Sequence, residues 1–177
     1  MLKWNPRGDY PEIDESAYID KTAVIVGRVK IGKNVFIGPG AVIRADEPKS
    51  TIIIRDNCNI QDRVTIHALE NSSVDIGENT SLAHGCIVHG PCRIGRNCFV
   101  GFGSVIFNAE LEDMVFVKLL AVIMEVKISA RRIIPNGAVV DTKQKIKSLK
   151  IKPKALDEFA QRVVKVNLDL VTGYRRR

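Results

Sequence analysis

The sequence predicts an all-β solenoid, a parallel β-helix that is completed by one C-terminal α-helix. Aliphatic residues recur at every sixth position, which is neither the period of a helix nor the short alternation of a hairpin strand. Three hexads make one triangular coil of about 18 residues, and we expect about seven coils. Neighbouring coils then lie ~4.8 Å apart, the spacing of paired strands. The aliphatic anchors are Ile19, Ile25, Ile31, Ile37, Ile43, Ile54, Ile60, Ile66, Ile76, Leu82, Val88, Ile94, Val100 and Ile106.

The residue two places before an anchor is usually small, as a tight corner requires. Examples are Ala17, Ala23, Val29, Val35 and Ala41. All four cysteines of the chain occupy this position, so we interpret them as compact core residues rather than metal ligands or disulfide partners. These cysteines are Cys58, Cys86, Cys92 and Cys98.

Two insertions interrupt the period, between Ile43 and Ile54 and between Ile66 and Ile76. Extra residues can leave a solenoid only as loops, and we therefore predict projecting loops at 46–50 and near 69–73. Beyond Ile106 glycine is scarce, and Glu112 stands where an anchor is due. The anchors that continue the pattern there are Leu111, Val117, Ile123, Ile128, Ile134 and Val140.

We expect one domain with three parts: an N-terminal extension (1–16), the β-helix (17–142), and a linker with the C-terminal helix and a basic tail (143–177). After Pro153 the apolar spacing becomes helical, and Gly173 is a candidate stop signal. The residues that share one helical face are Leu156, Phe159, Ala160, Val163, Asn167 and Leu170.

The net charge of +7 comes largely from lysines and arginines near the C-terminus. Aromatic residues are not interleaved with them, so we interpret a solvated basic surface and expect no nucleic-acid partner. No apolar run approaches the ~18 residues that cross a bilayer, and we expect no membrane partner. Residues 1–6 lack the apolar stretch of a signal peptide, so a cytoplasmic protein is expected.

The chain has three histidines, His67, His84 and His89. Counting three corners per coil places Arg44, His67 and His89 in one outward-facing column, with the two imidazoles one coil apart. That separation suits two ligands of one ion. The alternative interpretation is three surface histidines without a shared role.

His84 does not belong to this column. Five extended residues, about 16 Å of chain, separate it from His89, whereas metal-to-nitrogen distances are only ~2 Å. We therefore predict that His84 reaches His67 and His89 of a neighbouring subunit. A metal between subunits favours a homotrimer, because closed symmetry then gives three equal sites.

The two insertions carry carboxylates at matching offsets. Glu47 follows Arg44 by three residues, and Glu70 follows His67 by three. Exposed acids are usually only solvated, but two at one offset beside a metal site are candidates for proton transfer. The register also stacks Asp62 under His84.

Several segments resemble the γ-class carbonic anhydrases of the archaeal type, over nearly the whole chain. The most specific part is the combination of QD (61–62), the isolated histidine at 67, AH (83–84) and VHGP (88–91). The glutamates together with HALE (67–70) are typical of the catalytic branch of this family. The segments are WNP (4–6), AYID (17–20), IRADE (43–47), NIQDRVTIHALE (59–70), SLAHGCIVHGP (81–91) and VNLDLVTGY (166–174).

The resemblance implies a left-handed parallel β-helix and a lyase that hydrates carbon dioxide reversibly to bicarbonate with a metal-bound hydroxide. Zn²⁺ is the default cofactor, with Fe²⁺ or Co²⁺ as alternatives. The implied metal ligands are His67 and His89 of one subunit and His84 of the next.

The resemblance also implies roles for the surrounding residues. Gln61 would hydrogen-bond the metal-bound water or hydroxide, Glu47 would take part in proton transfer, and Glu70 would act as proton shuttle. Asn167 would contact the substrate. The interface network and surroundings of the site would include Arg44, Asp46, Asp62 and Trp4.

The chain departs from the family pattern in three places. The loop after Glu70 is shorter, Lys165 stands where a tyrosine is usual, and residues 111–133 lack the usual glycines. Two other functions remain as alternatives. A hexapeptide-repeat acyltransferase would share the repeat but needs no metal, and a non-catalytic assembly subunit would often lack a ligand histidine or the glutamates.

Overall fold

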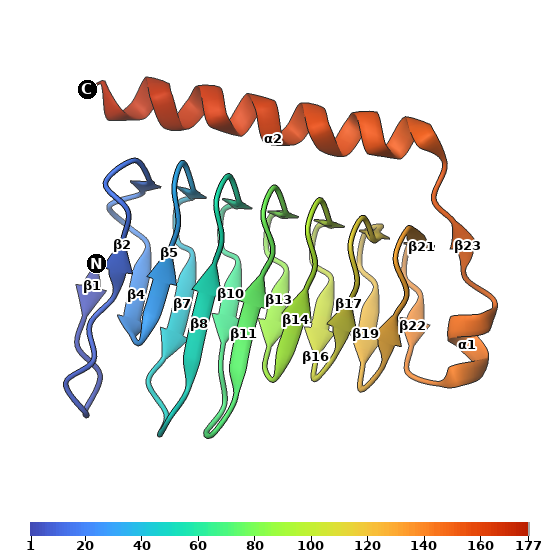
Figure 1. Cartoon of the computed structure of the whole chain (residues 1–177), viewed down its shortest axis with the longest axis horizontal. Helices are drawn as coiled ribbons and strands as arrows, with labels where there is room; N and C mark the ends of the chain where they lie inside the picture. The colour runs from blue at the N-terminus through green and yellow to red at the C-terminus, as the bar shows by residue number, and fades with distance from the viewer. Residues whose placement is uncertain (177) are drawn as a thin grey trace.

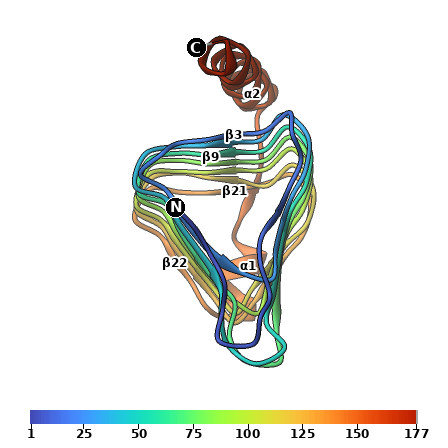
Figure 2. The same ribbon diagram turned by 90° about the vertical axis from the view of Figure 1, so that its left-hand side faces the viewer.

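The computed structural model describes residues 1–176 and is a triangular β-solenoid with one long helix beside it (Figures 1 and 2). Three sheets of eight, seven and eight strands form its sides, and all strand pairs are parallel except the last one in the third sheet. The predicted solenoid of about seven turns with a C-terminal helix is thereby confirmed.

Sheet 1, which carries two of the histidines, contains β1 (Leu2–Lys3), β4 (Val24–Gly27), β7 (Val42–Ala45), β10 (Thr65–His67), β13 (Ile87–His89), β16 (Val105–Phe107), β19 (Val122–Met124) and β22 (Val139–Val140). Sheet 2 contains β2 (Glu12–Ile13), β5 (Val29–Ile31), β8 (Thr51–Ile54), β11 (Ser73–Ile76), β14 (Cys92–Ile94), β17 (Glu110–Leu111) and β20 (Lys127–Ile128). Sheet 3 contains β3 (Tyr18–Ile19), β6 (Phe36–Ile37), β9 (Asn59–Ile60), β12 (Ser81–Leu82), β15 (Phe99–Val100), β18 (Phe116–Val117), β21 (Arg132–Ile134) and β23 (Lys150–Ile151).

The coil is left-handed, as the family resemblance implies. Figure 2 views the solenoid from its N-terminal end, and the chain passes from sheet 2 on the right over sheet 3 at the top to sheet 1 on the left as it recedes. A chain that turns counterclockwise as it moves away from the viewer forms a left-handed coil.

The anchors fill the interior. Ile25, Ile43, Ile66 and Val88 on sheet 1 are each 0% exposed, and full burial of such a side chain contributes about 2 kcal/mol. The four cysteines are free and buried among them, as predicted. Burial raises the pKa of Cys58, Cys86 and Cys98 to about 12, so these thiols stay protonated.

The insertions project where predicted. Residues 46–50 connect β7 to β8 and residues 68–72 connect β10 to β11, so the second loop starts one residue earlier than expected. Both loops project at the bottom corner of Figure 1. A third loop, residues 4–11, joins β1 to β2 at the same corner.

Residues 111–133 keep the fold without glycine. Leu111 pairs with Ile94 and is buried, whereas Glu112 lies at the surface and accepts a hydrogen bond from the Ala130 N–H. The step from Ile106 to the buried Leu111 is five residues instead of six, so Glu112 falls where a count of six expects an anchor. The left-handed turn positions are occupied by Met114, Leu120, Glu125 and Arg131, all with φ between 56° and 62°.

Both ends differ from the expected boundaries. Residues 1–16 carry β1 and β2, which pair in parallel with β4 and β5. The reason is that Ile13 stands six residues before Ile19, so the period begins earlier than the first anchor that we counted. The linker contains α1 (Lys143–Lys147) and β23, which pairs antiparallel with β21.

Helix α2 (Lys154–Arg175) lies along sheet 3 over nearly the whole solenoid (Figure 1). It buries Ala160, Asn167 and Val171. Gly173 does not end it, because the helical hydrogen bonds continue to Arg175. No helix within residues 1–176 is both long and apolar enough to cross a membrane.

Candidate metal site

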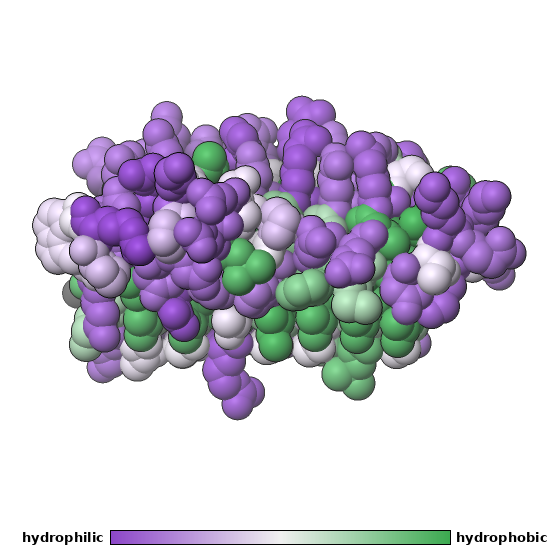
Figure 3. Space-filling model, turned by 90° about the horizontal axis from the view of Figure 1, so that it is seen from below, coloured by the Kyte–Doolittle hydropathy of each residue, from purple (hydrophilic) through white to green (hydrophobic). Residues whose placement is uncertain are grey.

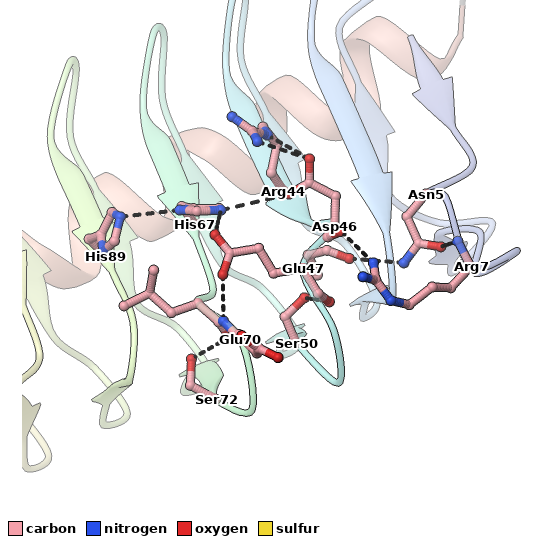
Figure 4. Close-up of polar contacts among 12 residues, drawn as sticks. Asn5, Arg7, Arg44, Asp46, Glu47, Ser50, His67, Glu70, Ser72 and His89 are labelled. Carbon is pink, nitrogen blue, oxygen red and sulfur yellow. Dashed lines mark hydrogen bonds and ion pairs between the residues drawn. The ribbon is translucent and has the colours of Figure 1, made fainter.

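Two imidazoles meet on the outer face of sheet 1. His67 and His89 are register partners on β10 and β13, and His67 Nδ1 lies 3.1 Å from His89 Nε2 (Figure 4). Two nitrogens that bind one tetrahedral ion at ~2 Å each are about 3.3 Å apart. The spacing of this pair therefore fits a shared metal ion.

The protonation of His67 also fits a metal. Burial lowers the pKa of His67, as do the ring of His89 and the charge of Arg44, while Glu47 and Asp46 oppose the shift. His67 is then neutral at pH 7 and keeps the lone pair that a ligand needs. His67 Nε2 and His89 Nδ1, the ring nitrogens that do not face the other histidine, are buried without a hydrogen-bond partner.

Carboxylates flank the pair. His67 Nε2 lies 3.4 Å from Glu47 Oε1 and 3.7 Å from Asp46 Oδ1. Arg44 Nε and Nη2 donate to Asp46 Oδ2 over 3.0 and 2.9 Å, which leaves the other Asp46 oxygen directed at His67. Carboxylates beside a ligating histidine orient its ring and raise its basicity.

The two loops are stacked and bonded to each other. In each, a serine hydroxyl caps the turn: Ser50 donates to Glu47 O and Ser72 to Leu69 O, both over 2.8 Å. The Glu70 N–H donates to Glu47 Oε2 over 2.6 Å. The Glu70 residue itself is exposed. Glu47 thus lies between the histidine pair and a loop that faces solvent.

His84 lies at another corner of the same solenoid, after β12. Its Nδ1 is 3.3 Å from Asp62 Oδ2, its ring lies near Phe102, and its side chain is 47% exposed. Within residues 1–176 no group of three histidine, cysteine or acidic side chains is placed to hold a metal. One chain therefore brings two of the three candidate ligands together and presents the third outward elsewhere.

The other predicted residues lie around these positions. Gln61 follows β9, and its Oε1 is buried without a partner. Asn167 belongs to the buried face of α2, is 6% exposed and donates to Val163 O within the helix. Trp4 is 65% exposed in the N-terminal loop, where its ring packs on Tyr10 at 4.8 Å, and no contact joins it to the histidines of this chain.

Two features were not predicted from the sequence. Asn59 on β9 is 0% exposed, and neither atom of its amide has a partner. The sequence feature that could have indicated it is a polar residue in a column of register partners that contains Phe36 one coil before it and Phe99 two coils after it. The other feature is the loop 4–11, which contacts the segment that carries Asp46 and Glu47.

The outer face of sheet 1 is apolar along the solenoid. The lower half of Figure 3 shows hydrophobic residues in a row, whereas the upper half is hydrophilic. Exposed members include Ile87 (39%) and Val139 (46%). The aligned outward positions are Val24, Val42, Thr65, Ile87, Val105, Val122 and Val139.

Known proteins share this architecture. The family described as bacterial transferase hexapeptide (six repeats) matches residues 10–45 and 73–108, and the hexapeptide repeat of succinyl-transferase matches 28–68. A carbonic anhydrase of Methanosarcina thermophila is 35% identical, over 99% of this chain and 79% of that protein. The carboxysome assembly protein CcmM of a Nostoc species is 37% identical, over 92% of this chain but only 31% of that protein. A hexapeptide transferase family protein from Anaplasma phagocytophilum has a TM-score of 0.84 at 26% identity, with 98% of both chains covered.

The fold and the repeat matches define a hexapeptide-repeat β-solenoid with a histidine pair on one face. Within that class, the chain belongs to the hexapeptide-repeat β-helix family that is related to γ-carbonic anhydrase and CcmM.

Proposed function

We propose that this protein hydrates carbon dioxide reversibly to bicarbonate at a three-histidine metal site between subunits of a homotrimer. The observation that carries the proposal is the 3.1 Å contact between the imidazoles of His67 and His89, with the Glu47 carboxylate beside it. The similarity to the M. thermophila carbonic anhydrase supports the same reaction.

The residues present fit a divalent ion. His67 and His89 would hold it from one subunit, and the outward-facing His84 of the next subunit would complete the set. Such an ion supplies a hydroxide under mild conditions, because it lowers the pKa of a bound water to about 7. Imidazole ligands suit Zn²⁺, and also Fe²⁺ and Co²⁺.

The other residues would orient the reactants and move the proton. Gln61 Oε1, buried and unpaired, is available to accept a hydrogen bond from water at the site. Glu47 would accept the proton beside His67, and the exposed Glu70 would pass it to solvent. Asp62 would orient His84, and Asn167 would contact the substrate.

The surface supports the homotrimer. An apolar row on sheet 1 is expected to be covered by another chain, since large exposed apolar patches mark interaction sites. Phe102 (45% exposed) and Leu119 (39% exposed) extend apolar surface beside His84. A neighbouring chain that covers sheet 1 would also bring its own His84 toward the histidine pair.

A second candidate function is assembly without catalysis, which the 37% identity to CcmM favours. The two functions share the fold and differ in the site. The hexapeptide transferase matches leave acyl transfer as a third candidate, one that needs no metal.

The test is metal analysis combined with stopped-flow hydration of carbon dioxide, on protein purified anaerobically and loaded with Zn²⁺, Co²⁺ or Fe²⁺. We expect one metal per subunit and hydration that a chelator abolishes. His84→Ala should lose metal and activity while the trimer persists. Full metal occupancy with no hydration would favour assembly, and activity without metal would reject the site.

A further inference from the structure

The N-terminal loop, residues 4–11, is folded around the side chain of Asn5. Asn5 is 5% exposed. Its Oδ1 accepts hydrogen bonds from the Arg7 and Asp9 N–H groups over 3.0 and 2.9 Å, and its Nδ2 donates to Asp9 Oδ2 over 2.9 Å. The Asn5 N–H also donates to Asp9 O over 3.0 Å. The loop is therefore a well-bonded turn with a defined place at the corner.

This turn is bonded to the segment that leads into the loop 46–50. Asn5 Nδ2 donates to Ala45 O over 3.3 Å, and Arg7 Nη1 donates to Asp46 O over 3.0 Å (Figure 4). Gly27, with φ of 82°, lies between the two segments, and a β-carbon there would overlap Ala45 O. The close approach therefore depends on glycine at this position.

Glu47, the residue after Asp46, lies nearest to His67 of the histidine pair. Glu47 Oε1 lies 3.4 Å from His67 Nε2, and Oε2 accepts from the Glu70 N–H. Besides the contact from Arg7, the loop 46–50 is held by the Arg44 side chain on Asp46 Oδ2, by its own Ser50 bonds and by the Asn71 N–H, which donates to Pro48 O over 2.8 Å. Arg7 is thus the side chain of the N-terminal turn that binds the backbone at the start of this loop.

We infer that Arg7 is a positioning residue for the Glu47 carboxylate, and that Asn5 fixes the turn from which Arg7 acts. The catalytic consequence of this inference rests on the proposed function. A proton acceptor has to stay within hydrogen-bond reach of its donor, and a shift of about 1 Å already costs much of the rate. Loss of the Arg7 contact releases Asp46 O and lets Glu47 leave its place between His67 and Glu70.

The chain offers a matched control in the same turn. Arg28 binds Asp9 through Nε and Nη2 over 3.2 and 2.9 Å, and its side chain makes no hydrogen bond to residues 44–50. Arg7→Ala and Arg28→Ala each remove one guanidinium from this loop region. Only Arg7→Ala removes a contact to the glutamate loop.

The experiment measures amide hydrogen exchange by NMR in the full-length, metal-free protein, and hydration kinetics in the metal-loaded protein. The reporter is the Glu70 N–H, whose acceptor is Glu47. We expect its exchange to rise about two- to tenfold in Arg7→Ala, the range of one lost hydrogen bond, and to stay unchanged in Arg28→Ala. We expect kcat to fall about two- to tenfold in Arg7→Ala with kcat/KM unchanged, and Arg7→Lys to recover part of it.

Unchanged Glu70 exchange in Arg7→Ala, or an equal rise in both variants, would overturn the inference, since Glu47 would then not depend on Arg7. A rise in exchange with unaltered kcat would overturn its catalytic part. If the wild-type protein shows no hydration at all, the proposed function fails, and the exchange comparison still decides whether Arg7 positions Glu47.

Discussion

The Glu47 carboxylate accepts a hydrogen bond from the backbone N–H of Glu70 over 2.6 Å. The two glutamates predicted as proton carriers are therefore joined, although 23 positions separate them in the sequence. The bond fixes the Glu47 side chain with one oxygen toward His67 and the other toward the solvent-facing loop. Such a placement suits a group that receives a proton at the site and releases it outward.

Glu47→Gln is expected to slow turnover without loss of metal. The amide can still accept from the Glu70 N–H, but it cannot take up a proton, so kcat should fall about 100-fold. Stopped-flow hydration in weak buffer measures this loss, and added imidazole should restore part of the rate as an external base. Metal content should equal that of the wild type.

The control for this variant is Glu15→Gln, an exposed glutamate remote from the histidines in sequence and on another corner turn. It should leave kcat unchanged. A Glu47→Gln protein with the wild-type kcat in weak buffer would remove Glu47 from the proton path.

The histidine pair could be predicted because a parallel solenoid converts sequence spacing into position. His67 and His89 are 22 residues apart, which is one coil and the extra residues of one loop. The same count placed Asp62 against His84. Both relationships depend only on the register of buried anchors, and burial specifies that register strongly.

The contacts of Asn5 and Arg7 could not be predicted in this way. They lie in a loop without a period, where the conformation is set by the side-chain hydrogen bonds of Asn5 itself. The partner of His84 is equally outside the reach of the period, because it belongs to another chain in the proposed trimer. The repeat therefore predicts the sheets and the columns on them, but not the loops or the contacts between subunits.

Asp157→Ala is expected to destabilise the protein by about 3 kcal/mol, because it leaves a buried charge unpaired. Lys152 Nζ lies 2.6 Å from Asp157 Oδ1, and the lysine side chain is only 1% exposed. This pair fastens the start of α2 to the end of the solenoid. Urea unfolding at one fixed protein concentration measures the change.

The matched control is Asp141→Ala, which breaks the exposed pair of Lys145 with Asp141. Exposed pairs contribute less than about 1 kcal/mol, so this variant should unfold close to the wild type. Equal unfolding midpoints for the two variants would show that the buried pair does not hold α2.

Stability should fall in acid in part through Asp113. Hydrogen bonds from the Arg96 side chain and backbone lower the pKa of Asp113 below its ordinary value of 3.8. Because the folded-state pKa is the lower one, the stabilisation is complete above pH 3.8 and is lost as the pH falls through the folded-state value. Asp113→Asn should show a shallower loss of thermal stability below pH 3.8 than the wild type. An identical acid dependence in both proteins would contradict this assignment.

A site shared between subunits predicts complementation between two inactive variants. His84→Ala lacks the ligand that one subunit would lend to its neighbour, and His67→Ala lacks a ligand of the pair. If equal amounts are unfolded and refolded together at random, about a quarter of all sites combine an intact pair with an intact His84. Hydration activity and bound metal should both return to about a quarter of the wild-type value.

The matched control is the mixture of His67→Ala with His89→Ala. Both substitutions affect the same half of the site, so no arrangement of these subunits restores an intact pair, and the mixture should stay inactive. Recovery in both mixtures would mean that His67 and His89 do not act together from one subunit with His84 from its neighbour. Recovery in neither, with mixed trimers verified by mass, would reject the site between subunits.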